Sequence, residues 1–189
     1  AKDLFYTKGV ATTAGSKILK DHVPDHDATV IERLREAGAV LVGKAGLHEF
    51  AYGITNNNPH FGPVRNPWDT SRIPGGSSGG STAALATDQC VFALGSDTGG
   101  SVRIPAAWCG VVGLKPTFGR ISRYGVFPLG HTLDHVGHFA HSVADVATIL
   151  GPKKARRAQE AALASMASAP ARAAASDTGT VRDSLHSSL

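Results

Sequence analysis

The chain has 189 residues, of which 42% are hydrophobic and 18% charged, so it is large enough for one globular domain with a sizeable core. Residues 1–150 carry 13 Lys and Arg against 12 Asp and Glu, and residues 151–189 carry 6 against 3, so the net charge of +4 lies mostly at the C-terminal end. A nearly neutral body without basic stretches interleaved with aromatic residues argues against nucleic-acid binding.

No apolar run approaches the length that crosses a membrane and no signal peptide is visible, so the default expectation is a cytoplasmic protein without membrane contact. Cys90 and Cys109 lie in apolar surroundings, which predicts buried thiols rather than a disulfide. After residue 151, Ala, Ser and Arg dominate and aromatic residues are absent. We therefore expect a folded domain over residues 1–150 and a low-complexity tail, disordered or weakly helical, over residues 151–189.

The first regular elements are predicted between residues 25 and 42. A helix over residues 25–38 begins at a capping Asp25 or Asp27 and ends at Gly38, with an apolar face formed by Val30, Ile31, Leu34 and Ala37. The apolar run at residues 39–42 then predicts a buried strand. A helix followed by a strand favours an α/β fold.

The rest of the body alternates turns with short elements. Residues 52–72 are rich in Asn, Pro and Gly and predict surface loops. Beyond them the pattern predicts a helix over 79–87, a buried strand over 90–94, a short helix over 103–113, loop with a short strand over 115–128, and a capped helix over 142–150.

Two loops rich in glycine and serine, at residues 74–81 and 95–105, are the most unusual stretches. The second follows the predicted strand and places Gly99 and Gly100 directly before Ser101. Glycines let the backbone adopt positive φ and let other atoms approach closely, so such a loop can direct several N–H groups at one point. A serine at the end of that loop is well placed to be a nucleophile beside an oxyanion site.

The two loops read GGSSGGS and GSDTGGSVRIP, and CGVVGLKPT follows at residues 109–117. Near the N-terminus, Lys2-Asp3, Lys8-Gly9 and the segment TAGS at 13–16 complete a pattern that resembles the amidase signature family over residues 1–150. The resemblance implies an α/β fold with a mixed β-sheet core flanked by helices, here incomplete. It also implies hydrolysis of a small-molecule carboxamide by a Ser–cis-Ser–Lys triad, without cofactor or metal. A homodimer stays open.

The same resemblance assigns roles to individual residues. Lys2 is the base, Ser77 passes the proton, and Ser101 attacks the carbonyl carbon. A neutral lysine can act in this way where burial lowers its pKa. The resemblance further implies a cis peptide bond between Gly76 and Ser77, and Ser78 is expected to form hydrogen bonds within the site. The oxyanion would be bound by the backbone N–H groups of Thr98, Gly99, Gly100 and Ser101, and an ion pair would hold the loop between Asp97 and Arg103.

Other interpretations compete for the same residues. Lys44 is a second candidate for the base, although the near P-loop match around it fails because Ala45 offers no hydroxyl for Mg²⁺. Ser78 fits the G-x-S-x-G pattern of α/β-hydrolases, but no strand is predicted directly before it. A zinc site is a third alternative, with the candidate ligands His131, Asp134, His135, His138 and His141, which Gly130 and Gly137 interrupt.

The substrate is the least determined feature. In the resembled family, the glutamine-hydrolysing A-subunit of the glutamyl- or aspartyl-tRNA amidotransferases tends to carry Gln at the position of Ile104. Ile104 cannot form a hydrogen bond with an amide. The sequence therefore favours a stand-alone amidase. The alternatives are the A-subunit of a tRNA amidotransferase and an inactive amidase fragment.

Overall fold

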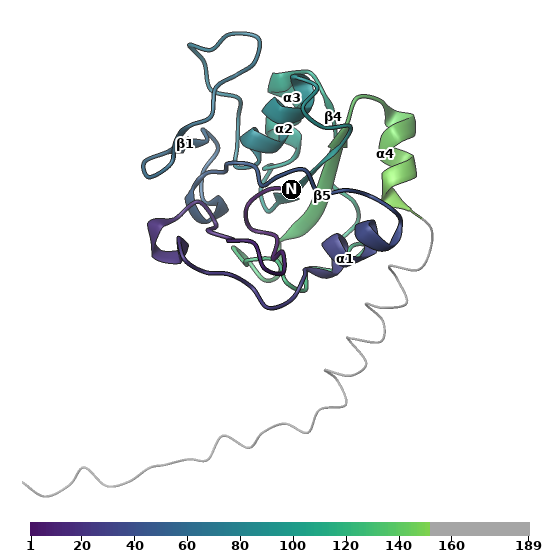
Figure 1. Cartoon of the computed structure of the whole chain (residues 1–189). Coiled ribbons are helices and arrows are strands. Elements are labelled where there is room, and N and C mark those ends of the chain that lie inside the picture. Colours follow the sequence, from purple (N-terminus) through teal and green to yellow (C-terminus); the bar gives the residue numbers. More distant parts are fainter. Residues whose placement is uncertain (152–189) are drawn as a thin grey trace, which may run out of the picture.

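The computed structural model describes residues 1–151, so the prediction of a disordered tail falls almost wholly outside the described residues. At its centre is an antiparallel sheet with the strand order β3-β5-β4 (Figure 1). Strand β5 (His135–Ala140) lies between β3 (Ala93–Asp97) and β4 (Val112–Leu114). A separate two-stranded ribbon consists of β1 (Asn57–Asn58) and β2 (Gly62–Pro63).

The N-terminal residues contact β3 through a backbone hydrogen bond. The backbone N–H of Lys2 donates to the carbonyl of Leu94 at 3.2 Å. On its other side the segment pairs in parallel with Ala45, whose N–H donates to the Ala1 carbonyl at 2.7 Å. The layer therefore contains antiparallel and parallel pairings, and the prediction of an α/β fold with a mixed sheet is confirmed.

Helices surround this layer, and α2 and α3 lie side by side next to the sheet (Figure 1). Helix α4 contacts β5 and β4. None of the helices among residues 1–151 is long and apolar enough to cross a membrane. The helices are α1 (Thr29–Glu36), α2 (Gly79–Ala86), α3 (Arg103–Cys109) and α4 (Val143–Leu150), with short 3₁₀ turns η1 (Lys17–Leu19) and η2 (Glu49–Ala51).

Two apolar clusters hold these elements together. One joins the N-terminal segment to α1 and the sheet, and its buried residues include Leu4, Phe5, Ile31, Leu47, Leu94 and Val136. The other packs α2 and α3 on the sheet through Leu85, Ala93, Val102, Ala106 and Phe139. Both clusters contact β3 and β5, so the burial that stabilises the sheet also fixes the segment before Phe5 and the loop before Val102.

Most predicted helices are found with shorter bounds. Helix α4 begins as expected, since Ser142 Oγ accepts a hydrogen bond from the N–H of Asp145 at 3.1 Å. Helix α3 ends at Cys109 rather than 113, because Gly110 adopts the left-handed conformation with φ 72°. Helix α1 begins at Thr29, and neither Asp25 nor Asp27 caps it.

The predicted buried strand at residues 39–42 is wrong. Val40 is 83% exposed and Val42 74% exposed, and the segment forms no strand. Similarly, β3 begins at Ala93 rather than at Cys90, and Val91 is 81% exposed. A strand needs a hydrogen-bonded neighbour, and within residues 1–151 none lies along these two stretches. Both cysteines are free thiols, as expected, but only Cys109 is buried as predicted, whereas Cys90 is half-buried.

Candidate active site

The Lys2 side chain is fully buried and lies among three serine hydroxyls. Its Nζ donates to Ser77 Oγ at 2.7 Å, to Ser78 Oγ at 2.9 Å and to Ser96 Oγ at 2.8 Å. Burial lowers the pKa of Lys2 from 10.5 to about 7, and the negative charges of Asp97 and Asp134 oppose that shift. Near neutral pH a large share of Lys2 is therefore the free amine, which is the form that can accept a proton.

The loop that carries Ser77 and Ser78 leads directly into α2. The Gly76–Ser77 peptide bond is cis, as the resemblance implied. Residues 46–48 hold this loop from one side: His48 N–H donates to the Ser77 carbonyl at 3.2 Å, and Gly80 N–H to the Gly46 carbonyl at 3.1 Å. A Cβ at position 80 would lie 2.3 Å from the Gly46 oxygen, so this approach requires glycine.

Asp97 organises the second loop. Its buried carboxylate accepts hydrogen bonds from the backbone N–H groups of Gly100, Val102 and Arg103, and two more from the Arg103 guanidinium. Burial alone would raise the pKa of Asp97, but these donors and the cationic Arg103 outweigh it, and the net shift is downward. The expected ion pair with Arg103 is present, and it lies at the turn that delivers Ser101 to the start of α3.

The two loops meet at their backbones. Ser78 N–H donates to the Ser101 carbonyl at 3.3 Å, and Ser101 is 7% exposed. Within residues 1–151 the Ser101 hydroxyl forms no hydrogen bond, so none joins it to Ser77. The structure thus contains the Lys2–Ser77 contact of the expected relay and places the Ser101 backbone against Ser78, whereas a contact between the Ser77 and Ser101 hydroxyls stays a prediction.

The four amides expected to bind an oxyanion are not equivalent. Gly100 N–H donates to Asp97 Oδ1 at 2.8 Å and is therefore occupied. The N–H groups of Thr98, Gly99 and Ser101 have no acceptor within the described part of the chain. These three are the amides that can turn towards a negatively charged oxygen.

Ser96 is the site residue that sequence reasoning missed. It lies in β3, one residue before Asp97, and its hydroxyl accepts the hydrogen bond from Lys2. The neighbouring Ser78 hydroxyl donates to the Ser96 carbonyl at 3.2 Å and accepts from the Ser96 N–H at 3.3 Å. A signal existed, because a serine and an aspartate at the end of a buried strand are uncommon where packing alone decides.

The remaining candidates lie apart from this cluster. The Lys44 amine contacts Phe5, Thr12 and Asp3 rather than a serine, which favours Lys2 as the base. No strand precedes Ser78 over residues 69–77, so the α/β-hydrolase interpretation fails. His138 is buried against the Val146 carbonyl, whereas His141 is exposed. Among residues 1–151 no three His, Cys, Asp or Glu side chains converge as metal ligands.

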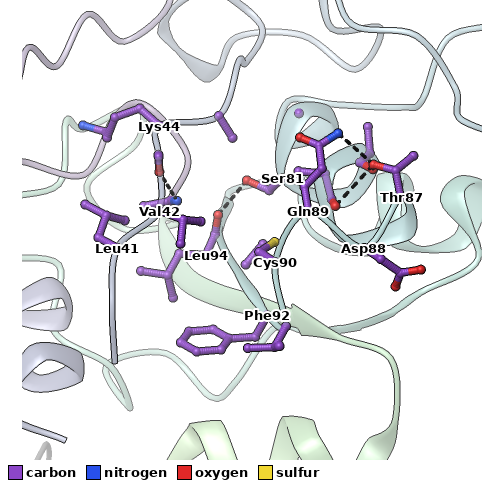
Figure 2. A pocket seen from close by; sticks show the side chains of 18 of the residues that line it. Leu41, Val42, Lys44, Ser81, Thr87, Asp88, Gln89, Cys90, Phe92 and Leu94 are labelled. Atoms are coloured by element: carbon purple, nitrogen blue, oxygen red, sulfur yellow. Dashed lines mark hydrogen bonds between the residues drawn. The ribbon is translucent and has the colours of Figure 1, made fainter. Parts of the chain in front are cut away.

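A large cavity lies elsewhere, between residues 39–45 and 87–94, with a volume of ≈ 1410 Å³. Figure 2 shows Leu41 and Val42 on one side of it and Cys90 and Phe92 on the other. None of the three residues of the expected relay lines it. It is bordered by the same exposed apolar stretches that fail to form strands, and it is not the place where the serine cluster would bind a substrate.

The buried Lys2 amine, whose pKa is lowered, thus donates to three serine hydroxyls, and the glycine-containing loop that carries Ser101 lies beside them. A lysine in such surroundings is one of the groups that can activate a serine hydroxyl. The sequence model described as Amidase matches residues 1–180. The chain therefore belongs to the Amidase family, and the resemblance found in the sequence is confirmed.

Several relatives are similar over most of this chain. The glutamyl-tRNA(Gln) amidotransferase A-subunit of Anaeromyxobacter dehalogenans is 60% identical over 149 residues, which cover 79% of this chain and 30% of the relative. The solved A-subunit of the Thermotoga maritima enzyme is 50% identical with a TM-score of 0.78, covering 81% of this chain and 35% of that one. A solved 6-aminohexanoate cyclic dimer hydrolase is 42% identical with a TM-score of 0.75, covering 82% and 34%. The chain spans about 30% of the length of the curated relatives it matches.

Proposed function

We propose that this chain carries the acyl-transfer centre of an amide hydrolase, with Ser101 as nucleophile, Ser77 as proton relay and Lys2 as base. The observation that supports this most directly is the 2.7 Å hydrogen bond between the fully buried Lys2 amine and the Ser77 hydroxyl. Burial lowers the pKa of Lys2 to about 7, so a proton acceptor is available near neutral pH.

The hydrogen bonds around Lys2 suggest which hydroxyl passes the proton. A neutral amine donates two hydrogen bonds and accepts one, so one of its three serine neighbours must donate to it. The Ser78 proton is directed at the Ser96 carbonyl, which leaves Ser77 and Ser96. Of these two, Ser77 directly precedes Ser78, whose backbone N–H donates to the Ser101 carbonyl. Ser77 is therefore the better candidate for passing the proton.

In the forward half-reaction Ser101 Oγ attacks the amide carbon while its proton moves to Ser77, whose own proton moves to Lys2 Nζ. The carbonyl oxygen becomes an oxyanion that the free amides of Thr98, Gly99 and Ser101 can stabilise. Collapse of this intermediate breaks the C–N bond, and the relay in reverse gives the leaving nitrogen its proton. Water then attacks the acyl-enzyme, delivers one proton through the same relay and releases the acid and free Ser101.

For the substrate we favour a stand-alone amidase acting on small amides with an apolar acyl part. Ile104 lies between the two loops, since a Cβ at Gly100 would be 2.8 Å from Ile104 Cδ1 and a Cβ at Gly75 would be 3.2 Å from Ile104 Cγ2. An isoleucine there offers no hydrogen bond to a glutamine side chain.

The second candidate is glutamine hydrolysis within a tRNA amidotransferase, and the 60% identity to the A-subunit of such an enzyme favours it. The two functions differ in substrate, so hydrolysis of glutamine can be compared with that of an aliphatic amide such as isobutyramide. Preference for the aliphatic amide supports the stand-alone function, and Ile104→Gln should then shift the preference towards glutamine. Preference for glutamine in the unaltered chain would favour the amidotransferase function.

The nucleophile is tested by labelling with a fluorophosphonate probe, which requires no knowledge of the substrate. The chain should be labelled once, Ser101→Ala should not be labelled, and Ser71→Ala, which alters an exposed loop serine, should be labelled at the normal rate. Equal labelling of Ser101→Ala would reject the assignment. A folded chain that is not labelled at all would support the inactive-fragment alternative. The expected cytoplasmic location and the homodimer stay predictions.

A further inference from the structure

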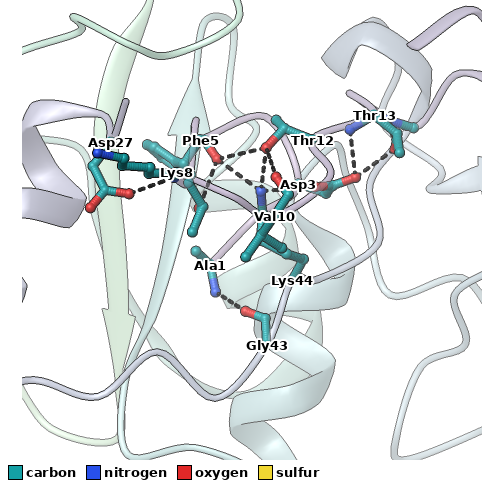
Figure 3. A network of polar contacts seen from close by, with 12 residues as sticks. Ala1, Asp3, Phe5, Lys8, Val10, Thr12, Thr13, Asp27, Gly43 and Lys44 are labelled. Atoms are coloured by element: carbon teal, nitrogen blue, oxygen red, sulfur yellow. Dashed lines mark hydrogen bonds and ion pairs between the residues drawn. The ribbon is translucent and has the colours of Figure 1, made fainter. Parts of the chain in front are cut away.

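A second lysine, largely but not fully buried, precedes the residue that pairs with Lys2 and touches no serine. The side chain of Lys44 is 13% exposed, and its Nζ donates to the Phe5 carbonyl and to Thr12 Oγ1, both at 2.8 Å (Figure 3). Its third neighbour is the buried Asp3 Oδ1, which lies 3.0 Å away. Two hydrogen bonds and one ion pair therefore hold the Lys44 amine in place.

Asp3 continues the network on the other side. Its Oδ2 accepts hydrogen bonds from the Thr13 N–H at 3.0 Å and the Thr13 hydroxyl at 2.5 Å. The ion pair therefore connects three stretches of chain, around residues 3–5, 12–13 and 44, as Figure 3 shows. Burial lowers the pKa of Lys44, and the negative charge of Asp3 together with its contact to the amine opposes that shift.

The residues beside Lys44 hold the residues beside Lys2. The Ala1 amino group donates to the Gly43 carbonyl at 2.9 Å, Ala45 N–H to the Ala1 carbonyl at 2.7 Å, and Asp3 N–H to the Ala45 carbonyl at 3.0 Å. The backbone at 43–45 thus fixes the chain on both sides of Lys2. The Lys44 side chain adds a second attachment through the Asp3 carboxylate, immediately after Lys2.

This attachment matters because the Lys2 amine has a demanding geometry. Its three hydrogen bonds span only 2.7–2.9 Å and reach residues 75, 76 and 94 positions away. A displacement of about 1 Å at a reacting group can cost roughly a hundredfold in rate. Lys2 and Asp3 are adjacent in the chain. Contacts that fix the Asp3 carboxylate therefore limit how far the Lys2 backbone, and with it the amine, can move.

We propose that Lys44 is a positioning residue for Lys2, acting through its ion pair with Asp3. This inference rests on the proposed function in assigning the base to Lys2. Lys44 touches neither serine loop, and its effect is to hold the backbone from which the Lys2 side chain extends. A lysine that only stabilised the fold would contribute to unfolding free energy without changing the chemistry at Ser101.

The test uses the full chain and three variants. Lys44→Met removes the cation at similar volume, Lys44→Arg retains it, and Lys17→Met alters an exposed lysine as the matched control. The rate of fluorophosphonate labelling is measured against probe concentration. For Lys44→Met we expect the maximal rate to fall at least tenfold with little change in the half-saturating concentration. Lys44→Arg should recover a substantial part of that loss, and Lys17→Met should match the unaltered chain.

A second readout does not depend on catalysis. The pKa of the Lys2 amine, followed by NMR of its side-chain nitrogen, should rise in Lys44→Met, because a loosened Lys2 reaches water and regains the ordinary ammonium. Lys44→Arg should keep it low. If the unaltered chain is not labelled, the proposed function fails, but this measurement still decides whether Lys44 positions Lys2.

Three outcomes would overturn the proposal. One is a lower melting temperature for Lys44→Met with an unchanged maximal rate and an unchanged Lys2 pKa. That result would show that Lys44 stabilises the fold without positioning Lys2. Another is loss of labelling in Lys44→Arg equal to that in Lys44→Met while the arginine variant stays folded. If Lys44→Met does not fold, Asp3→Asn replaces it, and normal labelling with a normal Lys2 pKa in Asp3→Asn would reject the inference.

Discussion

The amine of Lys2 lies 2.7 Å from the hydroxyl of Ser77, although 75 positions separate them in the chain. Lys2 is attached to the sheet through Leu94, and Ser77 is held by the backbone of His48. Lys2 and Ser77 belong to different segments of the chain. Their contact therefore depends on how the N-terminal segment, residues 46–48 and β3 pack together. Changes at the site and in the backbone that holds it should therefore have separable effects.

Labelling of Ser101 should depend on pH through Lys2. Because only the neutral amine accepts a proton and its pKa is about 7, the rate should rise nearly tenfold per unit below pH 7 and level off above it. Lys2→Ala should abolish most of the labelling and remove this dependence. A rate profile that is flat between pH 5 and 8 in the unaltered chain would contradict the assignment of the base.

Lys2 should also affect stability in a direction fixed by its pKa. The pKa is about 7 in the folded state and 10.5 for an ordinary lysine, so between these values the unfolded chain binds more protons than the folded one. The free energy of unfolding should therefore rise with pH in that window, by about 2 kcal/mol between pH 7 and 9 from this group. Urea unfolding of the unaltered chain and of Lys2→Met at both pH values measures it, and the variant should lack this rise.

Ser96→Ala should shift the pH profile downward. The Ser96 hydroxyl accepts a hydrogen bond from the Lys2 amine at 2.8 Å and so stabilises the ammonium form. Its loss should lower the pKa of Lys2 and move the midpoint of the labelling profile to lower pH, with a few-fold decrease in the plateau rate. Ser122→Ala, which alters a serine outside the cluster, is the control and should leave the midpoint unchanged.

Asp97→Asn should destabilise the loop that carries Ser101. The buried carboxylate accepts five hydrogen bonds, and an amide of the same shape cannot accept all of them or pair with Arg103. We expect a loss of about 3 kcal/mol in unfolding free energy and a marked loss of labelling. Because the pKa of Asp97 is lowered in the folded state, its contribution should persist at neutral pH and disappear only as the pH falls below the ordinary range for aspartate.

Gly80→Ala should disturb the start of α2. The new Cβ would lie 2.3 Å from the Gly46 oxygen and 2.7 Å from the Gly46 nitrogen, and backbone atoms cannot move aside as a flexible side chain could. We expect a destabilisation of about 1–3 kcal/mol with reduced labelling. Gly43→Ala is the matched control, because a Cβ there meets nothing within 4 Å. Equal melting temperatures for the two variants would contradict the close approach of residues 46 and 80.

The sequence alone predicted a site built from Lys2, Ser77 and Ser101, because the glycine and serine loops carry a specific pattern of residue types. The hydrogen bond between Lys2 and Ser77 is present, and the role of Ser101 stays a prediction. The sequence was also sufficient for the approximate positions of most helices, because apolar spacing is a local property, although of the predicted caps only Ser142 is present. It failed for residues 39–42, which are apolar but largely exposed. An apolar run is compatible with a buried strand, but the sequence does not show whether a neighbouring strand is available to pair with it.

Only the tertiary structure decided the partners of each group. It placed Ser96 against Lys2, occupied the Gly100 amide with Asp97, and directed Lys44 towards Asp3 instead of a serine. Ser96 and Lys2, like Lys44 and Asp3, are far apart in the chain, and no sequence spacing predicts their contact. Gly100 and Asp97 are close in the chain, but the orientation of their groups depends on packing. A linear pattern specifies which groups are available, whereas close hydrogen-bonded contacts between them arise only when the sheet and its flanking loops are assembled.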